Sequence, residues 1–283
     1  MAFLKPDKII NINGVICKQY IIPNHNINKL ALPSVRTVDG VGITVHNTPA
    51  INAASGTTQS EQYTRATVNG NIPGVFVHFY VCPVEIWQCF PCNWESWHAG
   101  SKRNGKGEPE ANGSHLGNRA TISIEVIGND PRAEDNAARL IAYIMDTYGY
   151  TSEQIYTHNY WVNIRRGKKA GTGEDLRTKP DGYKGCPVYI IPHWKTFISK
   201  VESYRKSQLQ NAKLFYVQVG AFSSEANAKN FLNDVQKNYP NAFIKKVDKL
   251  YYVQVGAFSS KDNADKYLET VKGKYKNAFI KTF

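Results

Sequence analysis

The sequence predicts an α/β protein in two parts: a mixed central sheet flanked by helices, followed by a small α+β domain with the order βαββαβ. Strand-like runs alternate with helical patterns over residues 41–206, and one block near the C-terminus occurs twice. The chain has 283 residues, more than most single cores contain. We therefore expect a first domain over residues 1–207, a linker over residues 208–213 and a second domain over residues 214–283.

The first domain contains several runs rich in β-branched and aromatic residues. These runs predict strands over residues 41–45, 74–81, 84–90 and 121–128. Because side chains alternate along a strand, Glu125 is expected on the face opposite Ile124 and Val126. Residues 1–40 are polar and predict an irregular lead-in with one strand at most.

Helical periodicity predicts helices over residues 60–67, 131–148 and 192–206. The second is the most clearly bounded, since Asp130 is a capping residue, Pro131 suits the first turn and Gly149 suits the end. Its predicted apolar stripe comprises Leu140, Ile141, Ile144, Met145 and Tyr148. Residues 100–117 contain five glycines and predict a long exposed loop, of the kind that often contributes to a site.

The second domain contains an internal repeat. The block over residues 215–224 returns at residues 251–260, and residues 241–245 return at residues 277–281. Each copy has a strand, helix, strand pattern. A single copy cannot bury its helix, so the two copies are expected to form one sheet with both helices on one face.

The net charge is +12 and the pI is about 9.3, which favours a polyanionic partner. Residues 213–283 alone carry twelve lysines and six acidic residues, a net charge of +6. Nucleic acid is one candidate, but the chain has no RNP motif, zinc-finger spacing or basic helix. An anionic bacterial wall is the other. No run of eighteen apolar residues occurs, so no membrane span is expected.

The five cysteines are an odd number, which argues for reduced thiols rather than a disulfide framework. Cys89 and Cys92 form a Cys-x-x-Cys motif, and Cys82 and His98 are near enough in sequence to suggest a second metal site. One such motif is a weak signal, so we expect these thiols to pack in the core. His78, in the same region, is also expected to be structural.

Two histidines and one cysteine stand at the ends of predicted elements. His46 and His158 each end a β-branched run, and Cys186 lies in a turn marked by Pro180 and Gly182. Two imidazoles and a thiolate would leave the fourth position of a zinc ion open, as in hydrolytic sites. Each residue taken alone also fits a buried structural role, so the residues by themselves leave both interpretations open.

Five short blocks, taken in order, resemble a known family. The blocks contain His46, Trp97-His98, Glu125, His158 and Lys184-Gly185-Cys186-Pro187. In this order they resemble the type 2 zinc amidases, which are N-acetylmuramoyl-L-alanine amidases related to peptidoglycan recognition proteins. The resemblance extends over residues 20–200 and implies a zinc ion, Zn²⁺, held by His46, His158 and Cys186.

The resemblance also implies roles for four further residues. Glu125 is expected to be the general base and Lys184 to stabilise the oxyanion. His98 and Asn118 are expected to contact substrate. One branch of the family uses a tyrosine at the position that Val77 occupies here, so the base is expected to be Glu125.

The repeated block resembles the SPOR domain, which binds peptidoglycan. The resemblances together imply a hydrolase that cleaves the amide bond between N-acetylmuramic acid and L-alanine. They imply a phage or prophage endolysin or, alternatively, a sporulation autolysin of mother-cell lysis. A non-catalytic peptidoglycan-binding protein is a further alternative, although such relatives typically lack the cysteine ligand.

The first seven residues lack the charged-then-apolar layout of a signal peptide. We therefore expect synthesis in the cytoplasm without a signal peptide, and action on the bacterial cell wall after release through a holin pore or by cell lysis.

Overall fold

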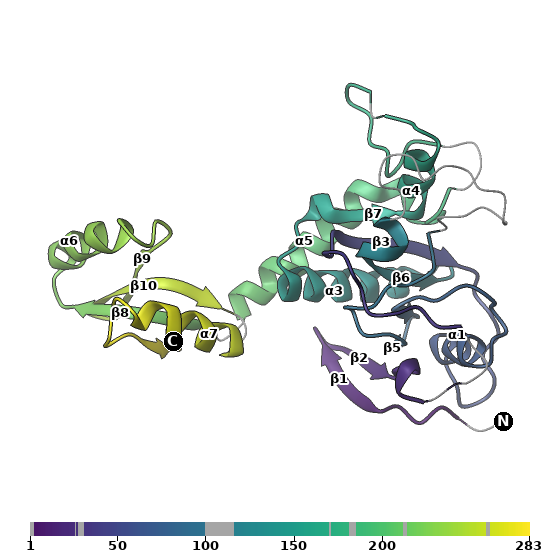
Figure 1. Cartoon of the computed structure of the whole chain (residues 1–283), viewed down its shortest axis with the longest axis horizontal. Helices are drawn as coiled ribbons and strands as arrows, with labels where there is room; N and C mark the ends of the chain where they lie inside the picture. Colours follow the sequence, from purple (N-terminus) through teal and green to yellow (C-terminus); the bar gives the residue numbers. More distant parts are fainter. Residues whose placement is uncertain are drawn as a thin grey trace. The chain divides into compact units, whose positions relative to one another are not determined.

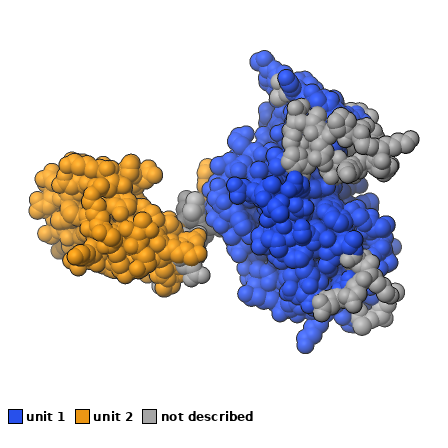
Figure 2. All heavy atoms as spheres, viewed as in Figure 1, with its two compact units in different colours: residues 1–205 blue, residues 206–283 orange. Residues whose placement is uncertain are grey.

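The computed structural model describes residues 3–25, 27, 31–99, 116–169, 171–180, 185–211, 214–258 and 261–283. The chain forms two compact units, residues 1–205 and residues 206–283, which Figure 2 colours separately. We refer to them as the N-terminal unit and the repeat unit. Among the described residues, no helix combines the length and the apolar character that a membrane span requires.

A seven-stranded mixed sheet forms the centre of the N-terminal unit, in the order β1-β2-β5-β4-β6-β3-β7 (Figure 1). Its strands are β1 (Lys8–Ile12), β2 (Val15–Gln19), β3 (Gly42–Thr48), β4 (Phe79–Val81), β5 (Ile86–Gln88), β6 (Thr121–Ile127) and β7 (Ile155–Thr157). Neighbouring strands are parallel except for the pairs β1–β2 and β4–β5. The predicted mixed sheet is confirmed.

Helices flank this sheet. They are α1 (Gln59–Val68), α2 (Leu116–Ala120), α3 (Pro131–Tyr148), α4 (His158–Arg165) and α5 (Trp194–Asn211). As predicted, Asp130 caps α3 by accepting a hydrogen bond from the backbone N–H of Arg132, and Gly149 ends it in the left-handed conformation with φ of 72°. The cap and the stop therefore fix the limits of α3.

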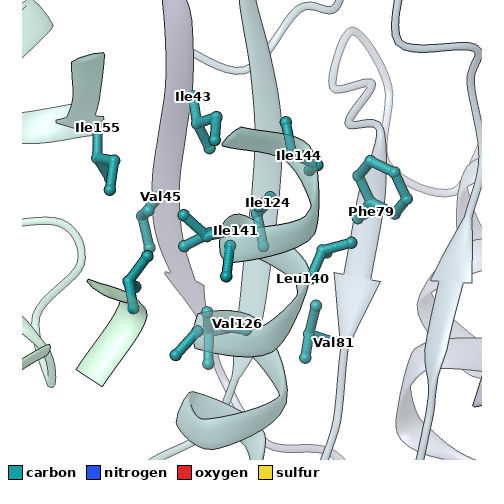
Figure 3. Close-up of a cluster of buried hydrophobic side chains, with 14 of the residues drawn as sticks. Ile43, Val45, Phe79, Val81, Ile124, Val126, Leu140, Ile141, Ile144 and Ile155 are labelled. Atoms are coloured by element: carbon teal, nitrogen blue, oxygen red, sulfur yellow. The ribbon is translucent and has the colours of Figure 1, made fainter. Parts of the chain in front are cut away.

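The main core lies between α3 and the central strands. Figure 3 shows Leu140, Ile141 and Ile144 of α3 lying against strand residues such as Val45 and Ile124. All five side chains are buried. Tyr148 is the exception to the predicted stripe: it is 46% exposed and stacks on Tyr150, because it falls in the last turn of the helix.

The predicted irregular lead-in is wrong. Residues 8–19 form a β-hairpin whose turn is Asn13-Gly14, with φ of 53° and 87°. Asn-Gly is the residue pair preferred where both turn positions need positive φ, so this hairpin had a local signal in the sequence.

Other element boundaries also differ from prediction. β3 continues through His46 to Thr48, so this histidine lies inside the strand. β4 is shorter than predicted: the backbone N–H of His78 donates to the Ser123 hydroxyl instead of to a strand neighbour. Helix α5 was predicted to end at residue 206 but continues to Asn211, into the stretch expected to be the linker.

The repeat unit has the predicted order βαββαβ. Its elements are β8 (Phe215–Phe222), α6 (Glu225–Gln236), β9 (Phe243–Val247), β10 (Leu250–Phe258), α7 (Lys261–Lys272) and β11 (Phe279–Lys281). The strands form an antiparallel sheet in the order β11-β8-β10-β9. Both helices pack on β8 and β10, around one core that contains Val217, Val253, Ala228 and Ala264. The predicted small α+β domain is confirmed.

Candidate metal centre and its surroundings

The parallel pairing of β3 with β6 and β7 places the candidate residues side by side. His46 on β3 lies in register with Glu125 on β6. On the other side of β3, Val45 pairs with Thr157, the last residue of β7. His158 follows immediately as the first residue of α4, whose N-cap is Thr157. Carboxyl ends of adjacent parallel strands thus bring together groups that are remote in sequence.

His46, His158 and Cys186 form one buried group of potential metal ligands. Their ligand atoms all lie within 4.8 Å of one another. The Cys186 sulfur is 3.7 Å from His46 Nδ1, and the rings of His46 and His158 have centroids 4.9 Å apart. The backbone N–H of Asn159 donates to the Cys186 carbonyl at 2.9 Å, which ties the cysteine to the start of α4. Two imidazole nitrogens and one sulfur suit zinc, whereas magnesium and calcium prefer oxygen ligands.

Glu125 lies at the edge of this group. Its Oε1 is 3.9 Å from His46 Nδ1, and its side chain is 14% exposed. The carboxylate therefore faces the same ring nitrogen as the Cys186 sulfur does, while keeping access to solvent. A base that must receive a proton from water or substrate needs both features.

His98 is buried on the other side of the His46 ring. Its Nδ1 lies 2.7 Å from His46 Nε2, and its Nε2 lies 3.4 Å from the Thr121 hydroxyl. The Asn118 side-chain oxygen accepts hydrogen bonds from the backbone N–H groups of His98 and Ala99, at 2.9 and 2.7 Å. Burial lowers the pKa of His98 to about 3, so the ring is neutral. His98 and Asn118 were predicted to contact substrate near the cleft, and the sequence contains no signal for the contact with His46.

The segment that leads to the cysteine is anchored by two asparagines of α4. The Asn159 amide donates to the carbonyls of Leu176, Arg177 and Lys179. Asn163, one turn later, donates to the carbonyls of Leu176 and Lys179. These residues were not singled out from the sequence. Residues 181–184 lie outside the described part of the chain, and so does the predicted oxyanion residue, Lys184.

Asn47 fixes the other side of the cysteine turn. Its side-chain oxygen accepts from the backbone N–H of Tyr189, and its amide donates to the Val126 carbonyl. One side chain thereby joins β3, β6 and the segment after Cys186. In the sequence, only the position of Asn47 next to His46 indicated this anchoring role.

The remaining cysteines and His78 lie away from this group. Across the residues described, no second set of three metal-ligating side chains occurs, and all five cysteines are free. Burial raises the pKa of Cys17 and Cys89 to about 12 and that of Cys92 to about 11, so these thiols stay protonated and unreactive. His78 is fully buried between the Ser123 hydroxyl and the Trp94 carbonyl, as expected of a structural residue.

A second notable group of side chains lies on the sheet face of the repeat unit opposite its helices, where the tyrosines and glutamines are buried and the lysines are partly exposed. By strand alternation this face carries equivalent residues of the two copies: Tyr216 and Tyr252, Gln218 and Gln254, Lys245 and Lys281. Lys245 Nζ lies 4.4 Å from the centre of the Tyr216 ring, and Lys281 Nζ lies 4.1 Å from that of Tyr252. The buried Gln254 amide has no hydrogen-bond partner among the described residues. We call these six residues the repeat face.

The fold and the ligand group together define a class: a two-unit α/β protein with a candidate metal centre at the carboxyl ends of parallel strands. Residues 36–174 match the family model for N-acetylmuramoyl-L-alanine amidase, and residues 211–282 match the model for the SPOR domain. The chain therefore carries a domain of the N-acetylmuramoyl-L-alanine amidase family followed by a SPOR domain. This finding confirms both resemblances noted in the sequence.

Several proteins of known name are similar to this chain. The N-acetylmuramoyl-L-alanine amidase XlyA of Bacillus subtilis is 30% identical over 166 residues, which cover 57% of this chain and 51% of XlyA. The amidase CwlH of the same species is 27% identical over 165 residues, covering 57% and 52%. A solved mutant endolysin from Bacillus subtilis is 26% identical, with a TM-score of 0.46, and the match covers 66% of this chain and 99% of that one. The chain thus spans about half the length of the curated relatives it matches.

Proposed function

We propose that the N-terminal unit is a zinc-dependent peptidoglycan hydrolase that cleaves the amide bond between N-acetylmuramic acid and L-alanine. One observation carries the proposal: in a domain of the amidase family, two histidines and a cysteine converge in a buried group beside a partly exposed carboxylate. His46, His158 and Cys186 would hold the zinc ion. When bound, zinc supplies Lewis-acid activation of water and of the scissile carbonyl.

Glu125 is proposed as the general base. A carboxylate on a buried strand is costly unless it is paired or lines a cleft, and this one faces His46 Nδ1 at 3.9 Å. From there it can accept a proton from the attacking water and return it to the departing nitrogen. Val77 is fully buried and has no acid–base chemistry, so it cannot replace Glu125 in that role.

Lys184 is proposed to stabilise the oxyanion. This role rests on the family resemblance and on its position two residues before Cys186. An ammonium next to the developing negative charge lowers the energy of the transition state more than that of the substrate.

The repeat unit is proposed to bind peptidoglycan through the repeat face. Lys245 and Lys281, the two members of this face that are not buried, suit the anionic groups of a wall. The net charge of +6 over residues 213–283 supports the same partner. The repeat face would hold the hydrolase at its insoluble substrate.

The proposed setting is lysis of a bacterial wall by a phage or prophage endolysin. A sporulation autolysin would use the same chemistry at a different time. Measuring whether the transcript rises on prophage induction or during sporulation separates the two, since the endolysin assignment requires the former.

Digestion of purified peptidoglycan tests the proposed reaction. The protein should release stem peptides with new L-alanine amino termini, lose this activity with a chelator and regain it with zinc. New reducing ends in place of new amino termini would show that a glycosidic bond is cut instead. Full activity after complete removal of zinc would overturn the proposed cofactor.

A further inference from the structure

The two ring nitrogens of His46 face different partners. Nδ1 points to the ligand group, 3.7 Å from the Cys186 sulfur, and Nε2 lies 2.7 Å from His98 Nδ1. The two imidazole rings meet edge to face, with an interplanar angle of 88°. Two ring nitrogens at 2.7 Å form a hydrogen bond only if one of them carries a hydrogen and the other does not.

The direction of that hydrogen bond follows from the ligand role of His46. A neutral histidine that offers Nδ1 to a metal must carry its hydrogen on Nε2. His46 Nε2–H is then the donor, and His98 Nδ1 is the acceptor. His98 in turn carries its hydrogen on Nε2, which faces the Thr121 hydroxyl at 3.4 Å.

The surroundings hold His98 in this orientation. Asn118 accepts hydrogen bonds from the backbone on both sides of the His98 side chain, at His98 and Ala99. Thr121, at the start of β6, also contacts the Thr44 hydroxyl on β3 at 2.7 Å. His98 therefore sits on a rigid frame made by the same two strands that carry His46 and Glu125.

We propose that His98 is a positioning residue of the metal centre, which fixes the ring orientation and the tautomer of His46 by accepting a hydrogen bond from its Nε2–H. The proposal rests on the zinc site proposed above and replaces direct substrate contact as the role of His98. Such outer partners of ligating histidines typically raise metal affinity by about 10- to 100-fold.

A matched pair of variants tests this role. The side chains of Asn and Leu branch at the same position, but only Asn offers an oxygen close to the place of His98 Nδ1. His98→Leu should weaken zinc binding by about 10- to 100-fold, and His98→Asn should recover most of that loss. Zinc affinity is measured on the full chain, stripped of metal, by competition with a chromophoric chelator. The visible spectrum of the cobalt-loaded protein should change in His98→Leu and stay close to the parent in His98→Asn.

His78→Leu is the control for general destabilisation. His78 is buried in the same unit but contacts Ser123 and the Trp94 carbonyl rather than a ligand. The His78→Leu substitution should lower the melting temperature and leave zinc affinity unchanged. Equal losses of zinc affinity in His78→Leu and His98→Leu would overturn the proposal. So would a His98→Leu variant that binds zinc like the parent but has a raised KM, which is the signature of a substrate contact.

The parent protein offers a test that needs no variant. Long-range ¹H–¹⁵N NMR spectra of the zinc-loaded full chain should assign His46 and His98 to the Nε2–H tautomer. A hydrogen on His98 Nδ1 would overturn the positioning role. If the parent binds no zinc at all, the proposed zinc site itself is wrong. That outcome differs from a His98→Leu variant that binds zinc as tightly as the parent, which refutes only the positioning role.

Discussion

The metal centre and the repeat face show two ways of building a polar site on a sheet. At the candidate metal centre, His46, His158 and Cys186 each come from a different part of the chain, and the described residues contain no second such group. On the repeat face, every residue of one copy has its equivalent in the other, as with Lys245 and Lys281. Loss of one ligand should therefore abolish the metal centre, whereas loss of one lysine should leave half of the repeat face intact.

The largest effect is expected from Cys186→Ser. The substitution removes the sulfur ligand from the proposed zinc site, where zinc would contribute several kcal/mol to transition-state stabilisation, so turnover should fall by about 10³-fold or more. Bound zinc, measured by atomic absorption, should be lost together with activity. A variant that keeps both would show that the cysteine is not a ligand. Cys82→Ser is the control, because Cys82 is a buried thiol outside the ligand group.

A graded loss of wall binding is expected from lysine substitutions on the repeat face. Lys245→Ala and Lys281→Ala should each weaken binding of the full chain to purified walls by up to about fivefold, the range for an exposed charge pair, and the double variant by about the product. Lys229→Ala is the control, since Lys229 lies on helix α6 and pairs with Glu225. Co-sedimentation at increasing salt measures the effect. Equal losses in all three single variants would show that only the total charge matters.

Gly220 and Gly256 are equivalent positions of the two copies, and substituting one of them tests how tightly the repeat unit is packed. A Cβ on Gly256 would lie 2.7 Å from the Phe258 ring, and a Cβ on Gly220 would lie 2.9 Å from the Phe222 ring. Gly256→Ala should therefore lower the free energy of unfolding of the repeat unit by about 1–3 kcal/mol, as overpacking usually does. Gly273→Ala, whose nearest neighbour would be 3.4 Å away, should be neutral. Urea denaturation separates the two results, and equal stability of both variants would contradict the packing argument.

A pH-dependent effect on stability is expected from His78. Burial, with Arg36 and His98 nearby, lowers its pKa from 6.5 to about 3, so the unfolded chain binds a proton there that the folded chain does not. Stability from this group is complete above pH 6.5 and falls as the pH drops toward 3, by at most about 1.4 kcal/mol per pH unit. His78→Gln should flatten the decline of unfolding free energy over that range. An unchanged slope would show that His78 is not the group responsible.

The repeat unit could be predicted from the residues alone, whereas the ligand group of the N-terminal unit could not. The repeat unit follows from the recurrence of residues 215–224, with one difference, at residues 251–260, because a single copy cannot bury its helix and the two copies therefore share one sheet. The ligand group did not follow from the residues alone, since a lone cysteine such as Cys186 is more often a packed thiol than a ligand. Only the family resemblance brought the three ligands together.

Contacts between loops that are distant in sequence could not be predicted, for a physical reason. The hydrogen bond between His46 and His98 depends on how Asn118 holds the backbone of His98 and Ala99, and no local sequence pattern predicts such a contact. The hairpin at Asn13-Gly14 is a different case, since its turn signal was present but outweighed by the polar composition around it.

The most direct measurement of the central claim is the turnover of Glu125→Gln on soluble muropeptide. The substitution keeps the volume and most of the hydrogen bonding of the side chain but removes the proposed base beside His46. Turnover should fall by about 10²-fold or more, while zinc content and melting temperature match those of the parent. A lowered melting temperature with nearly unchanged turnover of the folded enzyme would contradict the account, because Glu125 would then be a structural carboxylate.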